Sequence, residues 1–198
     1  MRLILASQSR ARADLLRAAG YRFAQIPSTL DEPPPAPGAD LIDHLAELAR
    51  RKARAVAAQH PAAWVLGADT ALALDGHLIG KPRNLRHAAA ILGALAGRTH
   101  RLSTAVCIIG PHTGSRRGRQ ELTGVDTACV ALRKWPAARI RRHVATLKPL
   151  AWAGAYALQE QGGAAIVAHI DGDPSTVIGL PMPIVDRLLI RLGYRPAW

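Results

Sequence analysis

The stretch Val65-Leu66-Gly67-Ala68-Asp69-Thr70 is an apolar run that ends on a carboxylate. Residues 63–68 have the length and the apolar character of a buried central strand. In α/β proteins the carboxyl end of such a strand opens onto the ligand crevice. A carboxylate there can hold a metal ion or take a proton from water, but an isolated aspartate at this place is also consistent with the cap of a turn.

Strands and helices alternate along the rest of the chain, and no long linker or internal repeat separates two parts. Apolar spacing and end signals predict helices from Ser7 or Ser9 to Gly20 and over residues 40–60, 86–95, 136–146 and 183–192. Strands are expected over residues 3–6, 21–27, 63–68, 71–74, 77–79, 100–109, 122–132 and 164–170, with a turn at residues 171–174. The sequence therefore predicts one α/β domain over residues 1–198, with a mixed β-sheet flanked by helices.

Composition favours a globular chain in a reducing compartment. The 198 residues are 49% hydrophobic and only 4% aromatic, so Ala, Leu, Val and Ile must build the core. The longest apolar runs fall short of the ~20 residues that a membrane span needs, and the N-terminal apolar block is too short for a signal peptide. Cys107 and Cys129 lie in apolar runs without a partner at metal-ligand spacing. We expect a cytoplasmic protein that does not bind membranes, with both thiols reduced.

The charge balance points to anionic partners. The chain has 26 Lys and Arg residues against 14 Asp and Glu residues, a net charge of +12. Such a balance fits nucleic acid or phosphorylated small molecules, and it is equally consistent with a genome-wide composition bias. The basic residues are scattered, and the densest cluster, residues 115–119, lies in an expected loop. This scatter disfavours nucleic acid as the partner. A nucleic-acid-binding module is therefore kept only as the alternative hypothesis. That hypothesis predicts a binding affinity that falls steeply with salt concentration.

Two acidic positions are candidate metal ligands. Asp69 ends the central strand, and Glu32 precedes a proline-rich loop over residues 33–38. Magnesium is usually held by one or two carboxylates together with substrate phosphates. Asp69 and Glu32 could supply those carboxylates.

Three cations could neutralise a polyphosphate. Arg12 lies on the first turns of a helix, and Lys81 lies in the turn Gly80-Lys81-Pro82. Lys52 lies on or beside the apolar stripe of the helix expected over residues 40–60, where it either extends to the surface or points into a cleft. Taken singly, Arg12 and Lys81 also fit solvated surface charges. Neither a Walker A loop nor a dinucleotide fingerprint is present.

The ordered set of motifs resembles the Maf family of nucleoside triphosphate pyrophosphatases. Each match is weak alone, but together they run in order over nearly the whole chain. The matching segments are residues 5–16, 31–32, 52–53, 67–70, 80–82, 95–100, 153–159, 170–173 and 177–181.

This resemblance implies an inosine triphosphatase-like α/β fold with an elongated mixed sheet and two lobes around a central cleft. It implies hydrolysis of a nucleoside triphosphate to the monophosphate and pyrophosphate with a divalent cation, Mg²⁺ or Mn²⁺, and often a homodimer. Asp69 would accept the proton of the water that attacks the α-phosphate, and Glu32 would help Asp69 to hold the metal. The implied phosphate ligands are Ser7, Ser9, Arg12, Lys52 and Lys81.

In the family, the positions that match Ala11, Thr70 and Gln159 bear on the choice of base. Thr70 and Gln159 resemble the residues at these positions in the branch that acts on dTTP and UTP. The branch that acts on 7-methyl-GTP tends to carry glutamate in place of Gln159. An amide can donate and accept toward a pyrimidine edge, but a carboxylate only accepts. Ala11 replaces the family's large side chain, which predicts a wider base pocket. The same chemistry on 7-methyl-GTP or on a broad nucleotide range is the alternative.

Overall fold

The computed structural model describes residues 2–30, 33, 39–112, 118–160 and 162–195. Its strands are β1 (Leu3–Leu5), β2 (Phe23–Gln25), β3 (Trp64–Leu74), β4 (His77–Ile79), β5 (Thr99–Ile109), β6 (Glu121–Leu132) and β7 (Val167–Asp171). Its α-helices are α1 (Arg10–Ala18), α2 (Leu41–Gln59), α3 (Leu85–Leu95), α4 (Ala137–Leu147), α5 (Pro174–Ile178) and α6 (Met182–Arg191). Two 3₁₀ turns, η1 and η2, cover Ala153–Ala155 and Gly163–Ile166.

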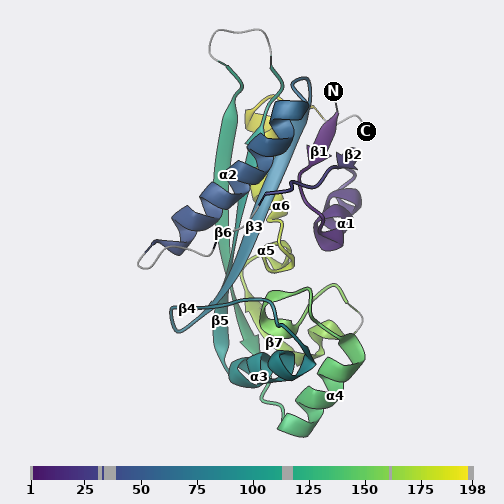
Figure 1. Ribbon diagram of the computed structural model, residues 1–198, viewed down its shortest axis with the longest axis vertical. Coiled ribbons are helices and arrows are strands. Elements are labelled where there is room, and N and C mark those ends of the chain that lie inside the picture. The colour runs from purple at the N-terminus through teal and green to yellow at the C-terminus, as the bar shows by residue number, and fades with distance from the viewer. Residues whose placement is uncertain (1, 31–32, 34–38, 113–117, 161, 196–198) are drawn as a thin grey trace. The chain divides into compact units, whose positions relative to one another are not determined.

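The strands form a seven-stranded sheet in the order β2-β1-β3-β5-β6-β7, with β4 paired to β3 (Figure 1). β1 is parallel to β2 and β3, whereas β3 is antiparallel to β4 and β6 is antiparallel to β7. The sheet is therefore mixed, which confirms the predicted α/β class.

The chain divides into two compact units. Unit 1 comprises Met1–Thr70, Thr104–Asp126 and Gly179–Trp198, and unit 2 comprises Ala71–Ser103 and Thr127–Ile178. β3, β5 and β6 contribute residues to both units. The expected cleft between two lobes stays a prediction.

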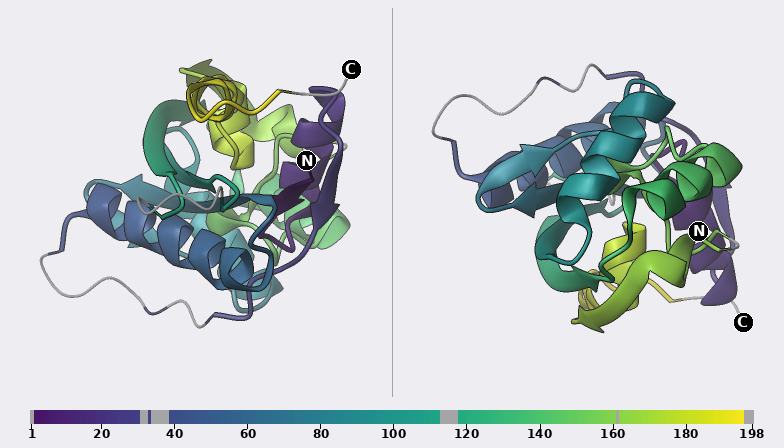
Figure 2. Two further views of the ribbon diagram at one scale, coloured as in Figure 1. Left: turned by 90° about the horizontal axis from the view of Figure 1, so that it is seen from above. Right: turned by 90° about the horizontal axis from the view of Figure 1, so that it is seen from below.

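In unit 1, side chains of β1 and β3 pack against α1 and α6. The parallel register places Leu5 opposite Leu66, and both belong to one buried cluster with Ala68, Leu16 of α1 and Val185 of α6. Because side chains alternate along a strand, the even-numbered residues of this part of β3 face α1 and α6. α2 lies on the other face, so that β3 is covered on both sides (Figure 2).

In unit 2, Leu72 and Leu74 of β3 enter a second buried cluster. Leu92 of α3 and Ile140 of α4 belong to the same cluster. The apolar stripes of both helices therefore account for their packing.

The helix ends agree with the cap residues in the sequence. The Ser9 side chain accepts from the Arg12 N–H and caps α1, so that Ser9 rather than Ser7 is its N-cap. The chain leaves α1 through Gly20, whose φ is 81°. The Asp40 side chain caps α2, at the first residue of the helix predicted over residues 40–60.

Four elements differ most from the sequence-based prediction. β2 covers only Phe23–Gln25, whereas a strand was expected over residues 21–27. β3 runs unbroken over Trp64–Leu74, whereas two strands were expected, over residues 63–68 and 71–74. Residues 164–166 belong to the 3₁₀ turn η2, which follows Gly162 at a φ of 81°, so β7 begins only at Val167. The expected turn ends in the short helix α5, where Asp173 accepts from the Ser175 N–H and Pro174 occupies the first helical position.

No helix among the described residues is both long enough and apolar enough to cross a membrane.

Candidate active site

A buried ion pair joins α2 to β3. Lys52 Nζ lies 2.5 Å from Asp69 Oδ1, and the two side chains are only 8% and 13% exposed. The pair compensates both charges where little water reaches them, which a lone buried lysine could not do. Lys52 therefore does not extend to the surface, which was the first of the two alternatives from the sequence. The second alternative, a lysine that points into a cleft, stays a prediction.

Gly67 explains why Lys52 can reach Asp69. A Cβ atom at Gly67 would lie 2.4 Å from Ala49 O and 2.7 Å from Ala53 N, both in α2. Only a glycine permits this close approach of helix to strand. Gly67 and Asp69 lie on the same face of β3 because side chains alternate. The spacing Gly-x-Asp thus brings the helix and its lysine to the carboxylate.

The guanidinium of Arg12 is bound by oxygens of unit 1. Arg12 Nε donates to Gly179 O at 2.7 Å, and Nη1 donates to Ala68 O at 2.8 Å and to Ser7 Oγ at 3.2 Å. Nη2 donates to Thr70 Oγ1 at 3.1 Å. Arg12 is therefore not an isolated surface charge, one of the two roles that fit its sequence context, because these hydrogen bonds hold it within the protein. Its expected role as a phosphate ligand stays a prediction.

The turn between β1 and α1 is fixed by hydrogen bonds. Ser7 Oγ accepts from the Ser9 N–H at 3.1 Å as well as from Arg12. Gln25 Nε2 donates to Ser7 O at 2.9 Å. Ser7 is buried, at 9% exposure. Burial and these hydrogen bonds together fix the position of Ser7 in the turn.

Two residues that the sequence did not point to form hydrogen bonds with predicted site residues. Thr104 Oγ1 lies 2.9 Å from Thr70 Oγ1, and Thr104 is completely buried. Gln25 holds the Ser7 carbonyl across the β1–β2 pair. Neither lies in a motif, and in a single sequence nothing distinguishes them from ordinary strand residues.

The structure brings most of the predicted site residues into unit 1. Lys81 and Gln159 belong to unit 2, where both are exposed, and their place beside Asp69 stays a prediction. Ala11 is half-buried on α1, and Glu32 lies outside the described residues. The predicted residues found in unit 1 are Ser7, Ser9, Ala11, Arg12, Lys52, Asp69 and Thr70.

The donor set around Asp69 fits one kind of divalent cation site. Among the described residues, no group of three or more His, Cys, Asp or Glu side chains could hold a metal ion by itself. Magnesium often uses one or two carboxylates and takes its remaining oxygens from substrate phosphates and water. Asp69 can be a carboxylate ligand in such a site. The remaining oxygen ligands would then come from the phosphates of a bound substrate and from water.

A histidine and two cysteines belong to the other buried or half-buried groups of the chain. His100 lies near the start of β5, and its Nε2 lies 2.7 Å from the Tyr156 hydroxyl in the interior of unit 2. Burial lowers the pKa of His100 to about 4. Cys107 is buried and Cys129 half-buried, and both are free thiols; burial raises the pKa of Cys107 to about 12.

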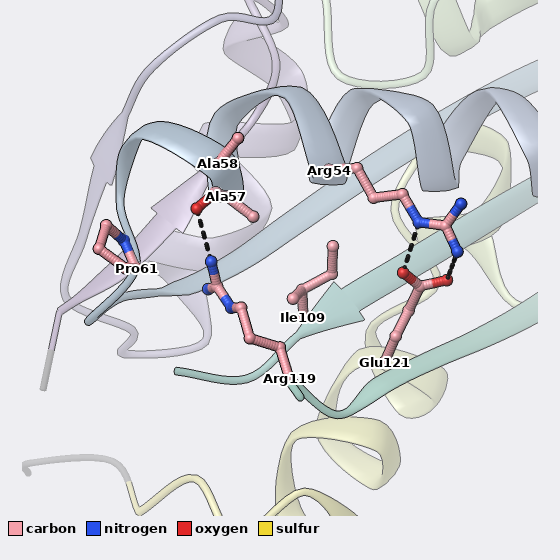
Figure 3. Close-up of a pocket in the computed structure, with 7 residues that line it drawn as sticks. All are labelled: Arg54, Ala57, Ala58, Pro61, Ile109, Arg119 and Glu121. Carbon is pink, nitrogen blue, oxygen red and sulfur yellow. Dashed lines mark hydrogen bonds and ion pairs between the residues drawn. The ribbon is translucent and has the colours of Figure 1, made fainter. Parts of the chain in front are cut away.

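A pocket of about 290 Å³ lies in unit 1 at the end of α2, and no predicted site residue lines it (Figure 3). Arg119 donates there to the carbonyls of Ala57, Ala63 and Gly110. Ala57 O belongs to the last turn of α2, where it also accepts from the His60 N–H at 3.2 Å. Arg119 therefore adds a side-chain donor at the end of this helix.

Fold and contacts together define an α/β protein in which an aspartate on a central strand is paired with a buried lysine, beside a hydroxyl-bearing turn held by an arginine. The model of the Maf-like protein family matches residues 2–192. The chain belongs to this family, which confirms the resemblance seen in its motifs.

Curated relatives match nearly the full chain. A dTTP/UTP pyrophosphatase of Myxococcus xanthus (strain DK1622) is 40% identical over 196 residues, which cover 99% of this chain and 95% of the relative. A dTTP/UTP pyrophosphatase of Anaeromyxobacter dehalogenans (strain 2CP-1 / ATCC BAA-258) is 41% identical over 197 residues, with 100% and 97% covered. A crystal structure of a dITP/XTP pyrophosphatase from Mycobacterium abscessus is 14% identical and covers 96% of this chain and 94% of its own, but its TM-score of 0.42 is too low to bear on fold or function.

Proposed function

We propose that this chain is a nucleoside triphosphate pyrophosphatase that hydrolyses dTTP or UTP to the monophosphate and pyrophosphate. The observation that carries this proposal is the Lys52–Asp69 pair on the central strand, with Nζ 2.5 Å from Oδ1. Membership of the Maf-like family and two relatives named dTTP/UTP pyrophosphatase support the substrate class.

Asp69 acts as the proton acceptor. The oxygen of a water molecule bonds to the α-phosphorus, the bond from that phosphorus to the bridging oxygen breaks, and pyrophosphate leaves. The water proton passes to the Asp69 carboxylate, which is general base catalysis. Lys52 compensates the charge of that carboxylate and orients it through Oδ1.

Hydroxyl and ammonium groups bind the phosphates. Ser7 Oγ accepts two hydrogen bonds, which occupy both lone pairs and leave its proton to donate to a phosphate oxygen. We assign Ser9, Lys52 and Lys81 to phosphate binding as well. A divalent cation, Mg²⁺ or Mn²⁺, held by Asp69 and Glu32, would neutralise charge on the phosphates.

Base choice is assigned to the positions Ala11, Thr70 and Gln159. Gln159 is exposed in unit 2, and its amide can both donate to and accept from a pyrimidine edge. The same chemistry on 7-methyl-GTP or on several bases is the alternative. We place the reaction in the cytoplasm, and we expect a homodimer, which sedimentation would detect.

A panel of nucleoside triphosphates tests the proposal, with pyrophosphate release measured over a range of Mg²⁺ and Mn²⁺ concentrations. We expect dTTP and UTP to be hydrolysed fastest, with no turnover in a chelator. In oxygen-18-labelled water, the label should enter the monophosphate and not the pyrophosphate. Release of inorganic phosphate, or label in pyrophosphate, would contradict attack at the α-phosphorus. Salt-sensitive nucleic-acid binding that survives Asp69→Asn, without hydrolysis by the wild type, would instead favour the nucleic-acid-binding module.

A further inference from the structure

Arg12 has a different role from the one its charge suggests. We propose that Arg12 is a positioning residue that holds the backbone around Asp69 and the hydroxyl of Ser7, and is not a ligand of the triphosphate. This inference rests on the proposed function, because it assigns Arg12 a role in that reaction.

The first support is the place of the Ala68 carbonyl. Leu66 O accepts from the Ala6 N–H at 2.7 Å, so it points toward β1. Carbonyls two residues apart on a strand point to the same side, and β1 ends at Leu5. Ala68 O therefore points past the end of β1, and Arg12 Nη1 supplies the donor at 2.8 Å. Arg12 thus provides the hydrogen bond that a longer β1 would have made.

The second support is that Arg12 binds both neighbours of Asp69. Arg12 Nη2 donates to Thr70 Oγ1 at 3.1 Å, one residue beyond the aspartate. The side chains of Ala68 and Thr70 lie on one face of β3 and that of Asp69 on the other. Arg12 therefore reaches the strand from the α1 side, whereas Lys52 reaches Asp69 from the α2 side. Together the two cations restrain Asp69 from both faces.

The third support is the orientation of the Ser7 hydroxyl. Arg12 Nη1 and the Ser9 N–H both donate to Ser7 Oγ, at 3.2 and 3.1 Å. With two lone pairs engaged, the hydroxyl proton is directed elsewhere. Loss of Arg12 would free one lone pair and let the hydroxyl rotate.

The fourth support is the close fit around Gly179. Its carbonyl accepts from Arg12 Nε at 2.7 Å, and its φ is 113°. A Cβ atom there would lie 3.2 Å from Thr70 Oγ1 and 3.4 Å from Arg12 Nε. Nε and both terminal nitrogens thus donate to oxygens in a planar arrangement. The single ammonium of a lysine cannot reproduce it, although it keeps the charge.

The test compares Arg12→Lys with Arg10→Lys, a substitution on the same helix at a side chain that is 95% exposed. The measurements are kcat, KM for dTTP and the inhibition constant of pyrophosphate, with kcat corrected for the folded fraction at the assay temperature. We expect kcat of Arg12→Lys to fall about 100-fold, as misplaced catalytic groups do. KM and the pyrophosphate constant should change less than about threefold, because binding groups are kept. Arg10→Lys should match the wild type.

Thr70→Val gives an independent test, because it removes one acceptor of Arg12 and leaves the arginine in place. We expect kcat to fall about tenfold with the pyrophosphate constant unchanged; this variant decides alone if Arg12→Lys does not fold. Two results would overturn the inference. One is an Arg12→Lys enzyme that retains kcat but shows about a tenfold rise in KM and in the inhibition constant of pyrophosphate. The other is a Thr70→Val enzyme whose kcat lies within about twofold of wild type. A wild type that releases no pyrophosphate from any nucleoside triphosphate contradicts the proposed function itself, and this role with it.

Discussion

Lys52 Nζ in α2 lies 2.5 Å from Asp69 Oδ1 in β3, with both side chains largely buried. The distance between this helix and this strand is set by Gly67, whose missing side chain leaves room for the backbone of Ala49 and Ala53. Charge pairing and packing are therefore linked at this site. A change that displaces α2 also displaces the lysine.

Gly67→Ala should separate α2 from β3. Its Cβ would lie 2.4 Å from a backbone oxygen, which cannot move as a side-chain end could. We expect the free energy of unfolding to fall by about 3 kcal/mol, as for an overpacked core, and pyrophosphate release to fall with it. Gly93→Ala in α3 is the control, since nothing lies within 4 Å of its Cβ; it should be neutral or stabilising by up to about 1 kcal/mol. Urea unfolding checks both, and equal stability of Gly67→Ala and wild type would contradict this account of the packing.

Lys52→Met should leave the Asp69 charge buried without its ammonium partner. Breaking a buried pair destabilises by about 3 kcal/mol, and the partial exposure of both side chains reduces that figure somewhat. The double variant Lys52→Met/Asp69→Asn carries neither charge, and so it should be more stable than Lys52→Met alone. Unfolding free energies from a double-mutant cycle measure this coupling. Additive effects of the two substitutions would show that the pair contributes nothing to stability.

Stability should fall in acid because of His100. His100 is 2% exposed, and burial lowers its pKa from 6.5 to about 4. Between these pH values the unfolded chain binds a proton at His100 and the folded chain does not. The contribution of neutral His100 to the free energy of unfolding is therefore fully present above pH 6.5 and is lost as the pH falls toward 4. The loss is on the order of 3 kcal/mol.

Urea unfolding at several pH values, for the wild type and for His100→Gln, isolates this contribution. The glutamine can still bond the Tyr156 hydroxyl but does not titrate. The variant should therefore lose less stability in acid than the wild type. Identical pH dependence of the two proteins would exclude His100 as the cause.

Gln159→Glu should change the ranking of substrates. The substitution replaces a group that donates and accepts by one that only accepts. We expect the ratio of kcat/KM for dTTP to that for 7-methyl-GTP to fall by about tenfold. Glu160→Gln, at the adjacent exposed position, is the control and should leave the ranking as it is. If Gln159→Glu also leaves it unchanged, the position does not contact the base.

The sequence predicted the strand before Asp69, a serine at the start of the first helix, the start of the second helix at Asp40 and the mixed α/β class, because local spacing determines these features. It left Ser7 and Ser9 open as the cap of the first helix. It could not decide between two positions for Lys52, since the closeness of α2 to β3 depends on packing at Gly67.

The sequence also could not show what holds Arg12. The acceptors Ala68 O and Gly179 O are backbone atoms 56 and 167 residues away along the chain. No side chain marks such an acceptor in a sequence, and only the fold brings them together. By contrast, the helix α5 was missed although Asp173-Pro174 is a recognisable cap and first-turn pair.

The rate of pyrophosphate release from dTTP by Asp69→Asn tests the central claim most directly. The amide keeps the size of the side chain and can still accept from Lys52, but it cannot take a proton from water. We predict a fall of about 1000-fold in kcat, within the range for loss of a general base, with the circular dichroism spectrum of the wild type. A folded Asp69→Asn protein with kcat within about twofold of wild type would contradict the assignment of Asp69 as the proton acceptor.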